Sequence, residues 1–162
     1  MHRYDPKPGR VLMTADAVGG VWTYSLELAR AFSDYGIQTS LAVMGAPLTA
    51  GRREEAERIP DIQLHEGEYK LEWMEDSWAD VERAGAWLLD LEEKLRPEII
   101  HLNGFAHASL PWKSPKIVVG HSCVLSWWDA VYGGPAPAYW DAYRRIVAGG
   151  LFSSDIVVSP SK

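Results

Sequence analysis

Short apolar runs alternate with helical patterns along this chain of 162 residues, and no other feature limits its fold as strongly. The apolar runs lie at residues 11–15, 37–44, 62–65, 98–102, 116–120 and 155–159. Between them, apolar side chains recur at helical spacing. Strands and helices that alternate in this way form a parallel sheet with helices on both faces. The sequence therefore predicts one doubly wound, Rossmann-like α/β domain of three αβα layers, with strand order 3-2-1-4-5-6.

Residues that start or stop helices set the limits of the helical segments. Gly36 ends the first helix and Pro97 ends the long helix of residues 81–95, whereas Ser77 is predicted to cap that helix at its start. Shorter helices are expected at residues 50–59, 105–110 and 138–149. The segment 123–137 is predicted to be a loop that follows the fifth strand.

A glycine turn joins the first predicted strand to the first helix. Gly19 and Gly20 stand in this turn, within the sequence TADAVGGVWTY at residues 14–24. Glycine lets a ligand approach the backbone, and the free N–H groups at a helix N-terminus attract anions. The turn therefore indicates a ligand that carries phosphate. The alternative is a tight strand-to-helix turn that binds nothing.

This turn lacks the features of two common nucleotide sites. It has no Gly-x-Gly-x-x-Gly pattern, and the second strand ends at Met44 and Gly45 with no carboxylate for a ribose hydroxyl. No Gly-Lys-Ser/Thr follows the turn either, which argues against a P-loop. A Rossmann domain that binds a nucleotide cofactor is therefore disfavoured and stays open only as an alternative.

Polar residues collect where the predicted strands end. In sheets of this kind, ligands bind outside the carboxyl ends of the strands. The residues that the strands place there are Asp16 to Gly20, His101, Asn103, Gly104, His121, Ser122, Ser159 and Ser161. This edge of the sheet is the candidate binding site.

Composition and charge exclude several functions. The formal net charge of −6 argues against a nucleic-acid partner, because such binding depends on Lys and Arg that neutralise phosphates. No apolar run approaches the length of a membrane span, and the first ten residues do not resemble a signal peptide. We therefore expect a cytoplasmic protein with no clear membrane segment.

Metal and thiol chemistry are not expected either. His101, His107, His121 and Cys123 do not have the paired spacing of metal ligands, and they fall on different predicted elements. A lone cysteine beside a strand is usually a small buried apolar residue, which argues against Cys123 as a nucleophile. The sequence predicts no metal and no cofactor.

Four segments in a fixed order carry a resemblance to a known family. They read ADAVGGVWTY at residues 15–24, HLNG at 101–104, VVGHS at 118–122 and DIVVSPS at 155–161. Together they resemble the amino-terminal domain of group 1 glycosyltransferases, also called family 4. Members of that family have the GT-B fold, in which two Rossmann-like domains face each other across a cleft. They transfer a sugar from a nucleotide-sugar donor to an acceptor hydroxyl, with retention of configuration and without a metal.

The resemblance implies that residues 1–162 are the acceptor-side half of such an enzyme, a retaining hexosyltransferase. The second, donor-binding domain on the carboxy-terminal side would be absent, so the isolated chain is expected to be inactive. The ligands of the whole enzyme would be a nucleotide sugar as co-substrate and a sugar or other hydroxyl acceptor. The alternative is a stand-alone, non-catalytic binding domain of the same ancestry, and the reading frame beyond Lys162 would distinguish the two.

The resemblance also implies roles for individual residues. The amides of Gly19 and Gly20 would face the donor diphosphate, and His121 matches the family histidine that approaches the transferred sugar. The acceptor pocket is expected to be lined by Asp16, Asn103 and Ser122. Structural alternatives stay open, because Asp16 could cap the first helix and His121 could be a strand-end histidine with no role in catalysis. His101 is expected to be structural.

Aromatic residues suggest further acceptor contacts. Trp127 and Trp128 fall in the predicted loop at the candidate site, and aromatic faces suit the C–H surfaces of sugars. We expect both to bind the acceptor. The alternative is a loop that is packed by its own aromatic residues. The segment 68–75, which is also rich in aromatic residues, is a second candidate surface.

Overall fold

Six parallel strands form a single sheet in the order β3-β2-β1-β4-β5-β6. The structure is a computed structural model, and it describes residues 7–17 and 19–160. The strands are β1 Arg10–Asp16, β2 Gln38–Met44, β3 Ile62–Glu66, β4 Ile99–Leu102, β5 Lys116–Val119 and β6 Ile156–Val158. The predicted strand order is therefore confirmed. Val18 of the glycine turn and Ser161 of the predicted site lie outside the described residues.

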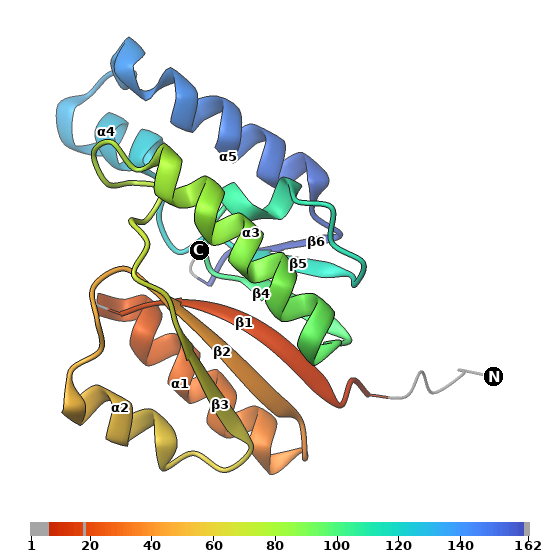
Figure 1. Ribbon diagram of the computed structural model, residues 1–162. Helices are drawn as coiled ribbons and strands as arrows, with labels where there is room; N and C mark the ends of the chain where they lie inside the picture. Colours follow the sequence, from red (N-terminus) through yellow and green to blue (C-terminus); the bar gives the residue numbers. More distant parts are fainter. Residues whose placement is uncertain (1–6, 18, 161–162) are drawn as a thin grey trace.

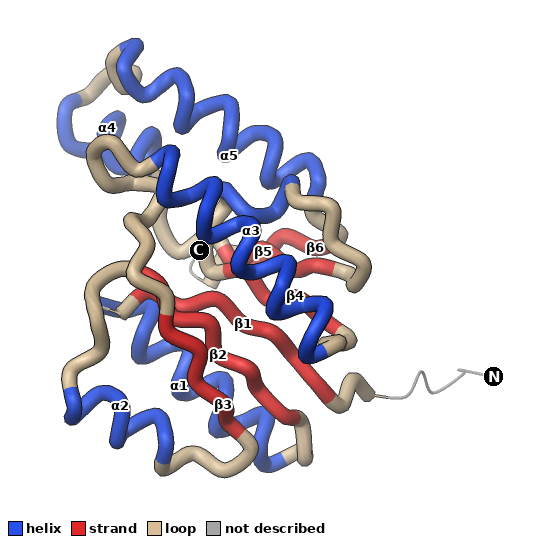
Figure 2. Tube along the Cα trace, viewed as in Figure 1, coloured by secondary structure: helices blue, strands red, loops and turns tan. Residues whose placement is uncertain are grey.

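Helices cover both faces of the sheet (Figure 1; Figure 2). They are α1 Gly19–Asp34, α2 Ala50–Glu57, α3 Trp78–Leu95, α4 Val124–Tyr132 and α5 Asp141–Ser153, together with the 3-10 helices η1 Ala106–Ser109 and η2 Ala138–Trp140. One face carries α1 and α2, and the other carries α3 and α5. The predicted three-layer, doubly wound α/β fold is confirmed.

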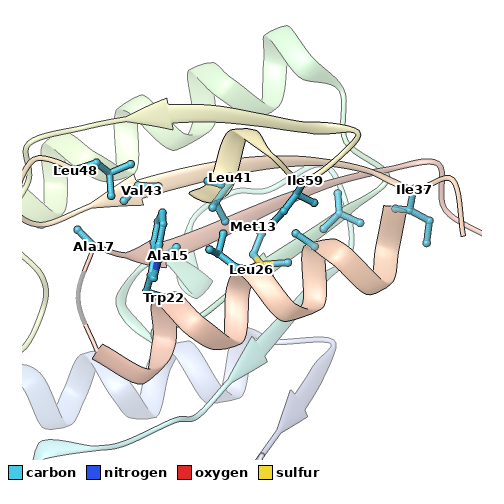
Figure 3. Packing of buried hydrophobic residues seen from close by; sticks show 13 residues of the cluster. Met13, Ala15, Ala17, Trp22, Leu26, Ile37, Leu41, Val43, Leu48 and Ile59 are labelled. Atoms are coloured by element: carbon cyan, nitrogen blue, oxygen red, sulfur yellow. The ribbon is translucent and has the colours of Figure 1, made fainter. Parts of the chain in front are cut away.

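The central strand β1 supplies both halves of the core. Met13 and Ala15 point toward α1, where they pack with Trp22 and Leu26 of that helix (Figure 3). Leu12 points to the opposite face and belongs to the cluster that includes residues of α3 and α5. Since both faces of this strand are buried, residues 11–15 are apolar except for the buried Thr14, as expected for a central parallel strand.

The segment 123–137 contains a helix, and the prediction of a loop was wrong. Helix α4 begins at Val124 and ends at Tyr132, before Gly133, whose φ of +70° places it in the left-handed region that ends helices. Val124 and Leu125 are partly buried against the core on the α3 side, so tertiary packing stabilises this helical turn. The aromatic residues of this segment therefore belong to a helix beside the site.

Ser77 precedes α3, but it does not cap the helix with its side chain. Its φ of −88° and ψ of −14° are helical, whereas a capping serine usually has extended backbone angles. The Ser77 hydroxyl is buried and has no hydrogen-bond partner among the described residues. Thr49 is a side-chain cap instead, because its hydroxyl accepts a hydrogen bond from the Arg52 amide of α2 at 3.3 Å.

Candidate functional site

A pocket of about 420 Å³ opens at the carboxyl ends of β1, β4 and β5. This is the edge of the sheet at which ligands of doubly wound domains bind. The predicted site residues that line it are Asp16, Gly19, Gly20, Asn103, His121, Ser122 and Trp127. Ligands of such sheets bind outside the carboxyl ends of the strands, and this rule correctly predicted that residues up to about a hundred positions apart in the sequence share one pocket. Trp128 does not line the described part of this pocket.

The glycine turn forms one wall of the pocket, at the start of α1. Gly19 has a φ of +73°, a conformation that side chains with a Cβ rarely adopt. A Cβ added at Gly19 or Gly20 would meet no atom within 4 Å, so the space in front of the turn is open. The first N–H groups of a helix have no partner within the helix and carry the positive end of its dipole. This wall can therefore attract an anionic group.

Asn103 is the centre of a hydrogen-bond network behind the pocket. Its Nδ2 donates to the Thr14 carbonyl oxygen at 2.7 Å and to Ser25 Oγ at 3.2 Å. The Ser25 hydroxyl in turn donates to the Val21 carbonyl at 2.8 Å, so its oxygen accepts from Asn103. Because a carbonyl only accepts, these bonds fix the orientation of the amide. Asn103 Oδ1 is then the atom that lies 2.8 Å from Nε2 of His121.

This network determines the tautomer of His121. An amide oxygen cannot donate, so Nε2 of His121 must carry the proton, and Nδ1 of the neutral ring keeps its lone pair. Burial lowers the pKa of His121 below its usual value of 6.5, which favours the neutral ring at pH 7. Tyr24 packs edge-on against the same ring, with 4.6 Å between the ring centroids. His121 is therefore held as a neutral hydrogen-bond acceptor.

His101 has a different environment, although it lies on the neighbouring strand. Its side chain is buried, and its Nε2 lies 3.5 Å from the Tyr24 hydroxyl. Burial is the main cause that lowers the pKa of His101 to about 4, although a hydrogen bond from the ring to Asn103 opposes it. His101 does not line the described part of the pocket. Its position agrees with the structural role that was expected from the sequence.

The low pKa of His101 predicts that acid destabilises the protein. In the unfolded chain this histidine regains a pKa near 6.5, so the unfolded state binds a proton first as the pH falls. The stabilisation is complete above that value and decreases as the pH falls toward 4. Between about pH 7 and pH 5, His101 alone should cost about 2 kcal/mol of unfolding free energy. Urea titrations at both pH values would measure this loss.

A His101→Gln variant is the control for this loss, since glutamine does not titrate. The histidines other than His121 contribute equally to the wild type and to the variant. The difference between the pH slopes therefore reports His101 together with its electrostatic interaction with His121. Equal slopes would show that His101 is already charged or solvated in the folded state.

The two tryptophans of α4 have different surroundings. Trp127 lines the pocket, and 53% of its surface is exposed. Trp128 packs against Tyr132 and Tyr139, with ring centroids 4.6 Å and 6.2 Å apart. Trp127 also contacts Tyr132 at 5.9 Å. The aromatic residues of this segment thus pack on one another, as one of the two sequence interpretations expected, and only Trp127 reaches the pocket.

Sequence reasoning missed Glu72, a carboxylate that is hydrogen-bonded into the pocket wall. Its oxygens accept hydrogen bonds from the Phe105 amide at 3.1 Å and from the Ala106 amide at 2.6 Å. Burial raises the pKa of Glu72, and these two bonds only partly oppose that effect. The aromatic residues of segment 68–75 suggest a binding surface, but they do not point to this carboxylate. Nothing local in the sequence links Glu72 to partners more than thirty positions away.

The remaining candidates have structural contacts. Nε2 of His107 lies 3.0 Å from the Val81 carbonyl oxygen, and Cys123 packs partly buried against the core on the α3 side.

Within residues 7–17 and 19–160, no three His, Cys, Asp or Glu side chains gather as a metal site would require. In the same ranges, no helix has both the length and the apolar character of a bilayer span.

Several solved structures with a similar fold are glycosyltransferases. A glycosyltransferase from Rickettsia africae ESF-5 matches 96% of this chain with a TM-score of 0.62 at 16% identity. A UDP-glucosyltransferase from Polygonum tinctorium, solved in a complex with 3,4-dichloroaniline, matches 99% with a TM-score of 0.64 at 12% identity. Phytolacca americana UGT2, complexed with UDP-2fluoro-glucose and pterostilbene, matches 98% with a TM-score of 0.61 at 9% identity.

This chain spans less than half of each of those proteins, namely 38%, 48% and 49% of their chains. At such low identity, these similarities establish the fold alone, which is that of one Rossmann-like domain of a GT-B enzyme. No curated protein matches the sequence. The family model described as Glycosyltransferase Family 4 matches residues 18–162, which is nearly the whole chain. The resemblance seen in the four motifs is thus confirmed, and the chain belongs to glycosyltransferase family 4.

Proposed function

We propose that this chain is the acceptor-side half of a retaining glycosyltransferase, which transfers a hexose from a nucleotide sugar to an acceptor hydroxyl without a metal. The observation that carries the proposal is the pocket in which the start of α1 and His121 meet. Family 4 membership supports the reaction class. The pocket supplies two things that the reaction needs: an anion-attracting wall and a neutral acceptor for a sugar hydroxyl.

The turn at Gly19 and Gly20 would stabilise the leaving diphosphate. Negative charge grows on that group as the bond to the sugar breaks, and amides already aimed at it need no reorganisation. An interaction with a helix terminus is worth about 0.3–2 kcal/mol at an exposed site. A donor aimed at developing charge in a dry cleft contributes about 3–4 kcal/mol. The turn would therefore act mainly in the closed, two-domain enzyme.

His121 would accept a hydrogen bond from a hydroxyl of the transferred sugar through Nδ1. Asn103 would then be a positioning residue, because it fixes the tautomer and the orientation of the ring from behind. Asp16, Ser122 and Trp127 would contact the acceptor, since they line the same pocket. Trp128 would only support Trp127 and the rest of the aromatic cluster.

The donor would be held mainly by a second domain, encoded beyond Lys162 in the cytoplasmic full-length enzyme. The coverage of the similar structures, between 38% and 49% of their chains, supports this division. The 162-residue chain alone should then bind a nucleotide diphosphate weakly and transfer no sugar. Detectable transfer by the isolated chain would contradict the assignment of the donor site to a second domain.

A charge placed in the glycine turn tests the proposal. UDP, added with EDTA so that no metal contributes, should shift the amide NMR signals of Gly19 and Gly20 in the isolated chain. Gly20→Asp should weaken this binding about tenfold, because the new carboxylate repels the diphosphate. The fold should tolerate the change, since the space beside Gly20 is open and an acidic residue suits a helix start.

Gly20→Ala is the matched control, because it adds a Cβ without a charge. It should bind UDP within about threefold of the wild type, which is well under 1 kcal/mol. Equal UDP binding by the wild type and Gly20→Asp would mean that the diphosphate does not lie at this turn.

A further inference from the structure

We propose that the acceptor half of this pocket selects a ring that carries free hydroxyls and no phosphate, and that Glu72 enforces the choice. The inference rests on the proposed function and adds the chemical class of the acceptor.

Glu72 is built into the wall of the pocket and is not a mobile surface acid. It reaches from the segment between β3 and α3 to the start of η1, where it binds the amides of Phe105 and Ala106. A Cβ on the neighbouring Gly104 would stand only 3.3 Å from a Glu72 oxygen, so glycine there makes room for the carboxylate. The wall therefore presents an oxygen pair at a fixed place.

The Glu72 carboxylate retains capacity for a ligand. Two carboxylate oxygens have about four lone-pair positions, and two amide donors occupy only part of them. A sugar hydroxyl can donate to the remaining positions, whereas a phosphate oxygen has no proton to donate when it is ionised. Burial opposes a charge on Glu72, whereas the hydrogen bonds from the two amides favour it. In its ionised form, Glu72 accepts from a hydroxyl and repels an anion with the same atoms.

The charged side chains that line the described part of the pocket leave it net negative when Glu72 is ionised, because one lysine offsets only one of two carboxylates. Asp16 adds a second carboxylate to the lining. Among the residues that the structure describes there, Lys70 is the only Lys or Arg, and its ammonium group donates to the Glu75 carbonyl at 3.0 Å. Phosphate recognition by proteins ordinarily uses Arg or Lys aimed at the ligand or a helix N-terminus. The helix terminus of this pocket is the turn at Gly19, which the proposed function assigns to the donor.

Aromatic faces complete the acceptor half. Trp73, from the Glu72 segment, and Trp127, from α4, both line the pocket, and about half of each side chain is exposed. Such faces bury the C–H surface of a sugar ring at a low entropic cost. Carboxylate and indole together therefore fit an uncharged, hydroxyl-rich ring.

A matched pair of probes tests this selection in the 162-residue chain. D-glucose and glucose 6-phosphate present the same ring and differ only by a phosphate, and the indole N–H signals of Trp73 and Trp127 would report binding. The uncharged ring should bind at least about tenfold more tightly than the phosphorylated one. In Glu72→Gln this ratio should fall below about threefold, because the amide keeps the shape of the wall but loses the charge.

Glu75→Gln is the matched control, since Glu75 lies exposed on the same segment and does not line the described part of the pocket. It should keep the wild-type ratio. The proposal is overturned if the wild type binds the phosphorylated ring as tightly as the neutral one, if the neutral ring shifts neither indole signal, or if Glu72→Gln keeps the ratio. If Glu72→Gln does not fold, the ratio of the two affinities in the wild type alone decides whether the pocket selects the neutral ring.

The UDP experiment separates this inference from the proposed function. UDP shifts at Gly19 and Gly20 without discrimination between the two rings would refute the acceptor class and leave the donor wall in place. Discrimination between the rings without UDP binding would support the acceptor class and refute the donor wall at Gly19 and Gly20.

Discussion

Replacing Gly150 with alanine should lower the free energy of unfolding by about 3 kcal/mol or more. Helix α5 crosses the start of η1 at this glycine. A Cβ at Gly150 would overlap the carbonyl oxygen of Phe105 and stand 3.0 Å from its carbon. Both atoms belong to the backbone, so no side-chain rotation can relieve the overlap. Urea denaturation of the wild type and the variant would measure the change.

The adjacent Gly149 provides a control in the same turn of α5. A Cβ there would lie 3.4 Å from the Ser109 hydroxyl, an ordinary contact. Alanine favours a helix over glycine by about 1 kcal/mol, so Gly149→Ala should leave stability unchanged or raise it. Similar losses for the two variants would mean that α5 does not approach Phe105 this closely.

Replacing His121 with alanine should lower kcat about a hundredfold in the enzyme that joins this domain to its donor-binding half. The variant loses a neutral acceptor that the Asn103 network holds in place for the sugar hydroxyl. The effect should fall on kcat more than on the KM for the nucleotide sugar, because the second domain would supply most of the donor affinity. Steady-state kinetics with the cognate donor and acceptor would measure both.

The pH dependence of the same enzyme distinguishes an acceptor from a structural histidine. Protonation of Nδ1 removes the lone pair, so kcat should fall as the pH drops through the lowered pKa of His121. Asn103→Asp places a carboxylate beside Nε2, which raises that pKa and should move the fall of kcat to higher pH. The variant should also be less stable, because it loses the hydrogen bonds that Nδ2 donates to Thr14 and Ser25. Asp90 lies on the exposed surface of α3, so Asp90→Asn should change neither kcat nor the pH at which kcat falls on the acidic side. A His121→Ala enzyme with near wild-type kcat would exclude the role.

Most of the fold could be predicted because the signals for its elements are local. An apolar, β-branched run such as residues 116–120 indicates a buried strand by itself, and the strand order follows from connection rules for parallel sheets. The same rules placed Gly19, Asn103 and His121 at one edge, since consecutive strand ends meet there. These residues could be found without any knowledge of their contacts.

The parts that failed depend on contacts between distant segments. Helix α4 is stabilised by Val124 and Leu125 packing on the core, and glycines and a proline nearby made its segment look like a loop. Ser77 has the residue type of a cap but the wrong backbone angles for one. Glu72 is held by the amides of Phe105 and Ala106, which lie at the start of η1, far from Glu72 in the sequence. Neither packing nor long-range hydrogen bonds have a local sequence pattern.

The hydrogen bonds of Asn103 divide the pocket into residues that resist substitution and residues that tolerate it. Its side-chain amide is fixed by three partners, so a replacement disturbs Thr14, Ser25 and His121 together. Ser122 and the exposed face of Trp127 lie outside this network. A library that varies only these outer positions would change the acceptor surface and keep the scaffold that holds His121. Under the proposed function, the domain is therefore a suitable starting point for varying the acceptor.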